Sequence, residues 1–322
     1  MRTGHALLVS IFGCHALCAQ APLRGLVDAH VHYNGDKAFL EKMSARLDPF
    51  DGTAFILTQA KDIPDVLEAM KRHPKRFVGL GSIRLDDPQA VSLVDKFHSA
   101  GFLGLGELTG PLKNYDDKSY TAIYERAESY GMIVLFHTGI VMRPNPDTPT
   151  DVSVDRMRVT TLDNIARRFP KLTIIGAHLG NPDYAWAAEI GRWNPNLYFD
   201  LSGSTLIKLQ ENYQIFKSIF WWSSVVSPHT PKSGASAFEK VVFGSDIFGA
   251  EIEEFDREIE RYRKMLDTCG VGQEAQANIF WYRSISRSNS SISPPKMSDP
   301  KITFSNALTP DFGVCGLTTL DH

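Results

Sequence analysis

Short apolar runs alternate with amphipathic segments through most of this chain. Eight of the runs have the length of strands, at residues 26–32, 54–58, 77–83, 102–108, 132–137, 172–178, 197–201 and 241–246. They are apolar on both faces, as in parallel strands that are covered on each side. Six of the segments between them have helical spacing, at residues 62–72, 88–100, 120–130, 154–169, 184–193 and 252–266. In the first of these, we expect Asp62 as the N-cap and Pro64 in the first turn.

The regular alternation of strand and helix predicts an α/β protein with a parallel sheet. Eight such units favour a single-domain (β/α)8 TIM barrel, which we place at residues 20–285. A doubly wound open sheet is the alternative, but no Gly-x-Gly-x-x-Gly or Walker-type loop follows the first strand. Residues 140–155 are Pro-rich and predict a lid or substrate wall, whereas residues 221–236 predict a surface insertion. Residues 286–322, rich in Ser and Pro, predict a poorly ordered tail.

The composition is that of an ordinary soluble globular protein, with 43% hydrophobic and 22% charged residues. The net charge of −3 and the lack of a strongly basic segment argue against nucleic acid as a partner. A small-molecule substrate, anions included, is the expected partner, and a homodimer stays open. Since the chain has four cysteines and no Cys-x-x-Cys pair, we expect neither a disulfide scaffold nor a structural zinc site.

The first 19 residues have the pattern of a secretory signal peptide. Arg2 provides a positive start, residues 6–13 form a short apolar core, and Ala19 is a small residue at the expected cleavage point. The apolar core is too short to span a bilayer. We therefore expect a secreted or periplasmic protein. An unstructured extension of a cytosolic protein and a lipidated cysteine are the alternatives.

The first strand carries two histidines in the pattern His-x-His. Successive side chains of a strand point to opposite faces, so His30 and His32 share one face. Two neighbouring neutral imidazoles can chelate a divalent metal ion. Taken alone, the pair is a weak signal for metal, and the plainer alternatives are a solvated strand end or one core histidine with a satisfied partner.

Other strands end in residues that suit the same chemistry. In a (β/α)8 barrel the active site lies at the carboxyl ends of the strands. The fourth, fifth, sixth and eighth runs carry, at or near that end, Glu107, His137, His178 and Asp246. Together with the two histidines of the first strand, they bring six potential ligands or acid–base groups to one mouth. This convergence predicts a metal site.

At this point the sequence resembles the amidohydrolase superfamily. It is most similar to the amidohydrolase-related branch that includes aminocarboxymuconate-semialdehyde decarboxylase. The resemblance covers about residues 26–278 and rests on residues 28–32, 137–139, 176–180 and 244–246 in that order and spacing. It implies a barrel that binds one or two divalent ions, with zinc expected first and manganese or another metal as the alternative.

The resemblance also implies a role for each matching residue. His30, His32 and His137 match metal ligands, and Asp246 matches a metal ligand that also serves as the base for water. His178 matches either a ligand of a second metal or a group that transfers a proton to the substrate. The chemistry agrees, because a metal lowers the pKa of bound water to about 7 and a neighbouring carboxylate can accept the proton.

Three further residues have open roles. Glu107 stands where many superfamily members have a carboxylated lysine that bridges two metals. It could bridge two ions, orient the site or bind substrate, and its plainer alternative is an ion pair with Arg84. Asp28 either holds a ligand histidine in its tautomer or makes a strand-to-loop hydrogen bond. Arg143 either binds a substrate carboxylate or is a solvated loop charge.

The leading functional hypothesis is a metal-dependent hydrolase that acts on an amide, ester or lactone carbonyl. The alternative at the same site is a non-oxidative decarboxylase of an aromatic or unsaturated acid. A rival of another class is a barrel that binds a metal or ligand without catalysis. A TatD-like nuclease is disfavoured by the acidic net charge and the lack of a basic stripe.

Overall fold

The computed structural model describes most of the barrel region of the chain. The described residues are 23–142, 147, 150–220, 238, 240–249 and 252–280. The expected signal peptide, Arg143, the expected insertion at 221–236 and the expected tail at 286–322 lie outside them. Among the described residues, no helix combines the length and the apolar character that a membrane crossing requires.

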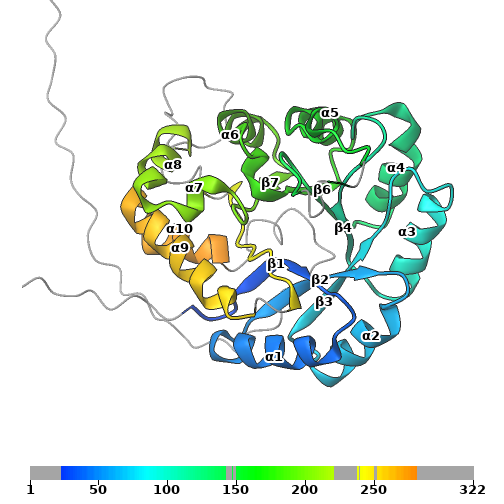
Figure 1. The fold of residues 1–322 in the computed structure, drawn as a ribbon, viewed down its shortest axis with the longest axis horizontal. Coiled ribbons are helices and arrows are strands. Elements are labelled where there is room, and N and C mark those ends of the chain that lie inside the picture. Colours follow the sequence, from blue (N-terminus) through cyan, green and yellow to red (C-terminus); the bar gives the residue numbers. More distant parts are fainter. Residues whose placement is uncertain are drawn as a thin grey trace, which may run out of the picture. The chain divides into compact units, whose positions relative to one another are not determined.

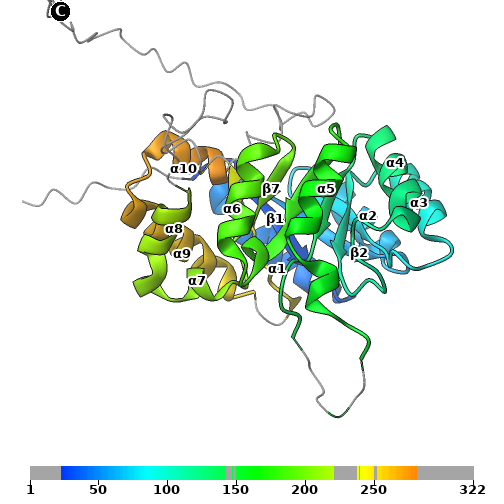
Figure 2. The same cartoon turned by 90° about the horizontal axis from the view of Figure 1, so that it is seen from above.

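The described residues form a curled parallel sheet surrounded by helices (Figures 1 and 2). Its seven strands pair in sequence order, β1 to β7. They are β1 (Val27–His32), β2 (Thr53–Gln59), β3 (Phe77–Ser82), β4 (Gly104–Leu108), β5 (Ile133–Phe136), β6 (Thr173–Gly176) and β7 (Leu197–Phe199). Each pair of neighbours is parallel. Every residue of β5 and β6 is buried, which agrees with runs that are apolar on both faces.

Residues 241–247 close the barrel between β7 and β1. Val241 forms an isolated parallel bridge with Phe199, and Ile247 forms another with Val31. The expected eighth run is therefore in place, but the prediction of a regular strand there is wrong. The backbone of Asp246 is left-handed, with φ of 56°, and such a residue cannot continue a ladder of strand hydrogen bonds.

Ten α-helices are seen in the described residues. They are α1 (Lys37–Leu47), α2 (Ile63–Arg72), α3 (Ala90–Ser99), α4 (Thr121–Ser129), α5 (Thr160–Arg168), α6 (Tyr184–Trp193), α7 (Thr205–Lys208), α8 (Tyr213–Phe220), α9 (Glu254–Cys269) and α10 (Gln273–Phe280). The six predicted segments correspond to α2 to α6 and α9, and the other four were not predicted. In α2 the position of Pro64 in the first turn is confirmed, but the Asp62 side chain makes no capping hydrogen bond.

The core has two parts, one inside the barrel and one between the sheet and the helices. In β5 the side chains of Ile133 and Leu135 belong to the inner part, and those of Val134 and Phe136 belong to the outer part. By this alternation the next inward position is 137, so strand geometry alone directs the side chain of His137 into the barrel mouth.

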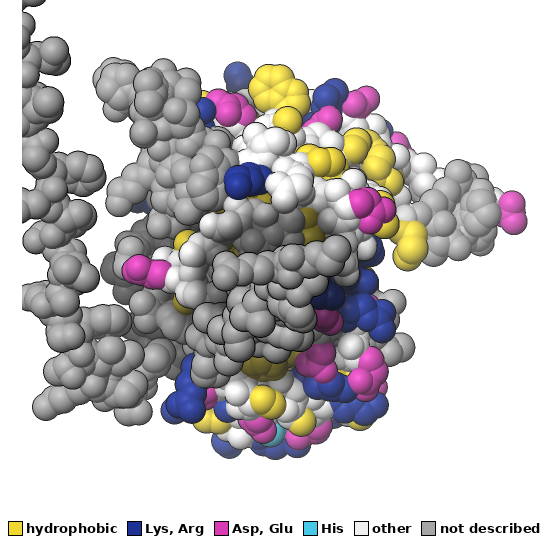
Figure 3. Space-filling model, turned by 90° about the vertical axis from the view of Figure 1, so that its left-hand side faces the viewer, with side chains coloured by type: hydrophobic (Ala, Val, Ile, Leu, Met, Phe, Trp, Pro, Cys, Tyr) yellow, Lys and Arg dark blue, Asp and Glu magenta, His cyan; other side chains and the backbone are white. Residues whose placement is uncertain are grey.

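Charged side chains of both signs are exposed on the helices, for example Glu41 on α1 and Arg72 on α2. On the face shown in Figure 3, acidic and basic side chains of the described residues are interspersed, and neither sign gathers into a stripe.

Candidate metal centre

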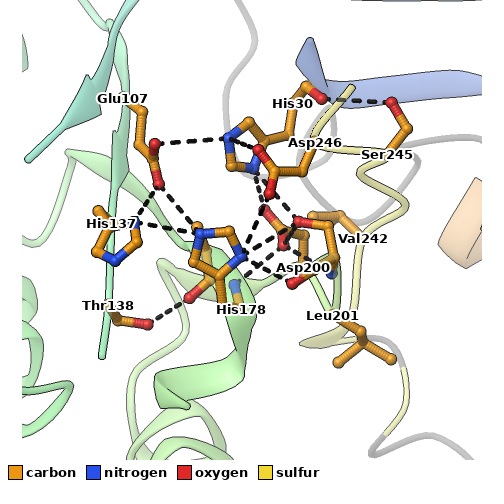
Figure 4. A network of polar contacts seen from close by, with 12 residues as sticks. His30, Glu107, His137, Thr138, His178, Asp200, Leu201, Val242, Ser245 and Asp246 are labelled. Carbon is orange, nitrogen blue, oxygen red and sulfur yellow. Dashed lines mark hydrogen bonds and ion pairs between the residues drawn. The ribbon is translucent and has the colours of Figure 1, made fainter. Parts of the chain in front are cut away.

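Six side chains predicted from the sequence come together at the mouth of the barrel. Figure 4 labels all of them except His32. They form two groups of possible metal ligands, and in each group the donor atoms lie within 4.8 Å of one another. The first cluster is His30, His32 and Asp246; the second cluster is Glu107, His137 and His178. The strands that supply them are far apart in sequence, so barrel closure creates the site.

The Glu107 carboxylate lies between the two clusters. Its Oε1 is 2.9 Å from His137 Nδ1 and 3.4 Å from His178 Nε2. Its Oε2 is 3.8 Å from His30 Nε2 and 3.7 Å from His32 Nε2. One oxygen therefore faces each cluster. The alternative of an ion pair with Arg84 is not what the structure shows, because the charged neighbours of this carboxylate are histidines.

Asp246 faces the first cluster from the opposite side. Its Oδ1 is 3.3 Å from His30 Nε2 and 3.1 Å from His32 Nε2. Its Oδ2 is directed towards His178, 3.9 Å from Nδ1. The side chain is 20% exposed, whereas that of His30 is fully buried. Asp246 is therefore the carboxylate of the first cluster that solvent or a substrate can reach.

Regular strand geometry does not by itself place all these side chains. In β6 the alternation that buries Ile175 and Ala177 inside the barrel would turn residue 178 outwards. His178 and Leu179 instead have φ of 61° and 48°, the left-handed region that non-glycine residues rarely adopt. This turn directs the His178 side chain into the mouth, and such backbone strain is typical of functional sites.

Three of the histidines are held by a hydrogen bond on the ring nitrogen that faces away from the cluster. His30 Nδ1 donates to Asp200 Oδ2 over 3.0 Å, and His178 Nδ1 donates to the Ser202 carbonyl over 2.7 Å. His137 Nε2 donates to the Ile140 carbonyl over 3.3 Å. In each ring the other nitrogen faces the cluster. Such outer contacts are the usual way in which a protein orients metal-binding histidines.

The donor atoms that face inward fit a divalent cation. His30 Nε2 and His32 Nε2 are 3.1 Å apart, and His137 Nδ1 and His178 Nε2 are 3.2 Å apart. Two imidazole nitrogens so close either share a proton in an N–H···N hydrogen bond or face a cation together. Imidazole and carboxylate donors are the set that zinc and similar ions bind, and they fit such an ion in both clusters.

The electrostatics of the site also favour a cation. Burial would lower the pKa of His30, but the carboxylates of Asp246, Asp200 and Glu107 raise it well above its usual value. Burial likewise opposes the effect of Glu107 on His178, whose pKa is raised to about 9. In the metal-free chain protons supply the positive charge that these carboxylates stabilise, and a metal ion displaces such protons when it binds.

The pKa values of the two carboxylates in the clusters are shifted in the opposite direction, downwards. Burial would raise the pKa of Glu107, but His30, His137 and His178 hold it well below its usual range. The pKa of Asp246 is lowered in the same way, since its neighbouring histidines outweigh burial. Both side chains are therefore ionised at neutral pH.

Asp200, immediately after β7, was missed by the sequence reasoning. It is fully buried and accepts the His30 ring hydrogen bond. The available signal was a carboxylate at the carboxyl end of the seventh apolar run, the same kind of position that identified Asp246. That signal was weaker than for the other site residues, because Asp200 belongs to none of the motifs that carry the family resemblance.

Asp28 makes the strand-to-loop hydrogen bonds that were one of its two alternatives. Its carboxylate accepts from the backbone N–H groups of His30 and Ser245 and from the Ser245 hydroxyl. Burial raises the pKa of Asp28 to about 7, although these hydrogen bonds oppose the shift. The imidazole of His30 is held by Asp200 and not by Asp28.

Arg143 is outside the described residues, so its predicted contact with a substrate stays a prediction. Two histidines outside the clusters have structural contacts: His73 bonds to Ser44 and Glu41, and His98 stacks on Tyr130.

Apolar side chains are exposed in the segments that follow the site residues. Phe248 is stacked on His32, with ring centroids 4.1 Å apart and planes 8° apart, and it is 47% exposed. In the segment after His137, Ile140 is 55% exposed and Met142 is 81% exposed. This segment is the beginning of the expected substrate wall at 140–155.

The comparisons with known proteins agree with this arrangement. A sequence model of the amidohydrolase family matches residues 19–282 of the chain. No curated protein matches the chain significantly in sequence. Solved structures share its fold, which identifies the curled sheet as that of amidohydrolase TIM barrels.

Three solved structures illustrate the shared fold. A probable 2-pyrone-4,6-dicarboxylic acid hydrolase from Acinetobacter baumannii, with citric acid bound, has a TM-score of 0.54 at 13% identity, covering 82% of this chain and 98% of its own. The 5-carboxyvanillate decarboxylase from Sphingomonas paucimobilis has a TM-score of 0.53 at 12% identity, covering 83% and 99%. The 2,6-dihydroxybenzoate decarboxylase from Rhizobium has a TM-score of 0.53 at 12% identity, covering 82% and 98%.

Proposed function

The chain belongs to the amidohydrolase family, and we propose that it is a metal-dependent hydrolase that uses activated water to cleave an amide, ester or lactone carbonyl of a small molecule. One observation carries the choice of hydrolysis. The two oxygens of Glu107 face two separate ligand clusters, which is the arrangement of a site for two cations. Two-metal sites are well suited to clamp the attacking water and the group under attack.

The residues of each cluster would hold one ion. His30, His32 and Asp246 would hold the first, His137 and His178 the second, and Glu107 would contact both. Zinc suits this set of nitrogen and oxygen donors, with manganese as the alternative. When bound, such an ion lowers the pKa of its water to about 7 and polarises the substrate carbonyl.

Asp246 is the residue that we assign as the base. Its lowered pKa keeps it ionised at neutral pH, and its side chain is partly exposed at the mouth. With Oδ1 facing the first cluster, Oδ2 is the oxygen that can accept the proton of the attacking water. The proton then passes to the leaving nitrogen or oxygen.

His178 fits a ligand better than a proton donor. Its Nδ1 donates to the Ser202 carbonyl, and its Nε2 faces Glu107 and His137. Both ring nitrogens are therefore engaged within the protein. His178 could transfer a proton to the substrate only if the substrate displaced one of these contacts.

The mouth favours a substrate with an apolar or aromatic part. The ring of Phe248 is half exposed and fixed parallel to the ring of His32, so it offers a flat face beside the first cluster. A planar ring stacked on such a face gains about 0.5–1.5 kcal/mol beyond the area that it buries. An aryl ester or a fused lactone has the carbonyl and the flat apolar group that this arrangement can hold.

Non-oxidative decarboxylation is the second candidate. The same fold carries two decarboxylases of hydroxylated aromatic acids, so the architecture permits that reaction. In that case His178 or Asp246 would deliver a proton to carbon. The second cluster distinguishes the two reactions. Decarboxylation needs only a single cation that holds the substrate, whereas the proposed hydrolysis uses a cation in each cluster.

The test uses the purified chain, its metal content and two substrate panels. After zinc or manganese is restored, we expect about two ions per chain, acid release from aryl esters and lactones, and no carbon dioxide from aromatic acids. His137→Ala should lose the second ion and the activity, whereas His98→Ala, a surface control, should keep both. One ion with carbon dioxide release would replace hydrolysis by decarboxylation. Bound metal without turnover in either panel would leave a binding protein.

A further inference from the structure

Asp200 contacts residues of both ligand clusters without belonging to either. Its Oδ2 accepts the hydrogen bond from the ring of His30, in the first cluster. Its Oδ1 accepts from the backbone N–H of His178, in the second cluster, over 3.1 Å. Oδ1 also accepts from the backbone and the hydroxyl of Ser202, over 3.1 and 2.6 Å. Figure 4 shows Asp200 between His30 and His178.

On the first cluster, Asp200 decides which nitrogen of His30 can bind a metal. The Asp200 carboxylate oxygen accepts this hydrogen bond, so the ring nitrogen that it contacts carries the proton. Nδ1 is that nitrogen, and Nε2 is left to face His32, Asp246 and Glu107. Because His30 and Asp200 are both fully buried, water does not compete for this hydrogen bond.

On the second cluster, Asp200 holds the strained turn that carries His178. Its side chain accepts from the N–H of His178, and its own carbonyl accepts from the N–H of Leu179 over 2.9 Å. These are the two residues with left-handed backbone. Such a conformation costs about 1–2 kcal/mol per non-glycine residue, and the two hydrogen bonds offset this cost.

We propose that Asp200 is a positioning residue for both halves of the metal centre, setting the tautomer of His30 and the orientation of His178. The inference rests on the proposed function in that it requires the centre to bind metal. Beyond that function, both ligand clusters depend on the one buried carboxylate of Asp200, so its removal weakens metal binding by both clusters.

The variant Asp200→Asn tests the tautomer directly. Three donors face the Oδ1 position and one faces the Oδ2 position, so the amide of Asn places its oxygen at Oδ1 and its NH2 group towards His30. An NH2 group can only donate, and Nδ1 of His30 must then accept. The proton moves to Nε2, which removes the nitrogen that faces the first cluster as a metal ligand.

We expect Asp200→Asn to bind zinc 10–100-fold more weakly than the wild type in competition with a chromophoric chelator, the usual effect of losing a carboxylate behind a ligand histidine. Circular dichroism should show the fold retained. Asp163→Asn is a matched control, because Asp163 also accepts hydrogen bonds, from Arg167 and Asn194, but contacts neither cluster. It should bind zinc as the wild type does.

A measurement on the wild type keeps the proposal testable if the variant fails to fold. In the zinc-loaded, ¹⁵N-histidine-labelled protein, the His30 ring should carry its proton on Nδ1, with the shift of a hydrogen bond to a carboxylate. A proton on Nε2, or wild-type zinc affinity in a folded Asp200→Asn, would overturn the role of Asp200. A wild-type chain that binds no zinc would instead overturn the proposed function.

Discussion

The backbone of Gly203 lies so close to His178 that a Cβ atom at position 203 would be 2.9 Å from His178 Nδ1. The same atom would be 3.1 Å from Asp246 Oδ2. Gly203 also has φ of +62°, a conformation that a side chain disfavours. The absence of a side chain here therefore keeps open the space between a residue of the second cluster and the proposed base.

We expect Gly203→Ala to lose most of the activity and at least one bound ion, since the methyl group must displace His178 or Asp246. Elemental analysis and turnover of an aryl ester measure this. Gly101→Ala is the matched control, because Gly101 has φ of +83° and nothing within 4 Å of its Cβ position. Both variants pay about 1–2 kcal/mol of backbone strain, but only the first fills the site. Equal loss of activity in both would contradict the role of Gly203.

Removal of Glu107 should change the metal stoichiometry. Each oxygen of the Glu107 carboxylate faces ring nitrogens of a different cluster. We expect Glu107→Ala to bind no more than one ion per chain where the wild type binds two, with loss of hydrolysis. Glu68→Ala, which removes an exposed glutamate of α2, is the control. Two ions retained in Glu107→Ala would show that this carboxylate does not bridge.

Metal removal should lower the thermal stability of the protein. A ligand that binds only the folded state stabilises it by about 2.7 kcal/mol at a concentration 100 times its Kd. For a barrel of roughly 260 residues that corresponds to a fall in Tm on the order of 5 °C per ion on treatment with a chelator. Calorimetry with and without EDTA measures it, and added zinc should restore the original Tm. An unchanged Tm in a sample shown to lose its metal would contradict coupling between the centre and the fold.

The fold was predictable from the sequence because the alternation of apolar runs and amphipathic segments persists through the barrel. The helix α1 was equally accessible, since Phe39, Leu40, Met43 and Leu47 share one face. The irregular backbone of residues 241–247 could not be predicted, because the apolar run that ends at Asp246 has the pattern of an ordinary strand. Its left-handed residue depends on contacts such as the hydrogen bond from Asp246 N to the His30 carbonyl.

The candidate site was predictable as a set of residues, but the geometry among them was not. Position at a strand end identified Glu107 and His178, yet a strict alternation would turn His178 away from the mouth. The pairing of β4 with β5 also shifts register between Leu105 and Leu108, next to Glu107. Asp200 could not be assigned its role because its partner, His30, lies 170 positions away, and spacing reveals no such contact.

Phe248 should affect the choice of substrate and not the metal content. Its ring stacks on His32 but supplies no ligand atom. We expect Phe248→Ala to raise the KM for an aryl ester roughly 3–10-fold, equivalent to the 0.5–1.5 kcal/mol of an aromatic contact, with little change for a short alkyl ester. Leu103→Ala is the control, since Leu103 is also exposed but precedes β4, at the opposite end of the barrel. An equal change for both esters would contradict selection by stacking.

Cys269 makes the stability of the protein depend on alkaline pH. It is fully buried in α9, its Sγ donates to the Tyr213 carbonyl, and burial raises the pKa of its thiol from 9.0 to about 11. The unfolded thiol therefore ionises first, so the stabilising effect of the buried neutral thiol is complete below pH 9 and is lost as the pH rises to 11. The loss is about 2–3 kcal/mol at most.

We expect the free energy of unfolding in urea, under reducing conditions, to fall less steeply over this range in Cys269→Ala, which has no thiol to ionise at this position. Parallel pH profiles for the two proteins would show that this thiol does not control the alkaline limb.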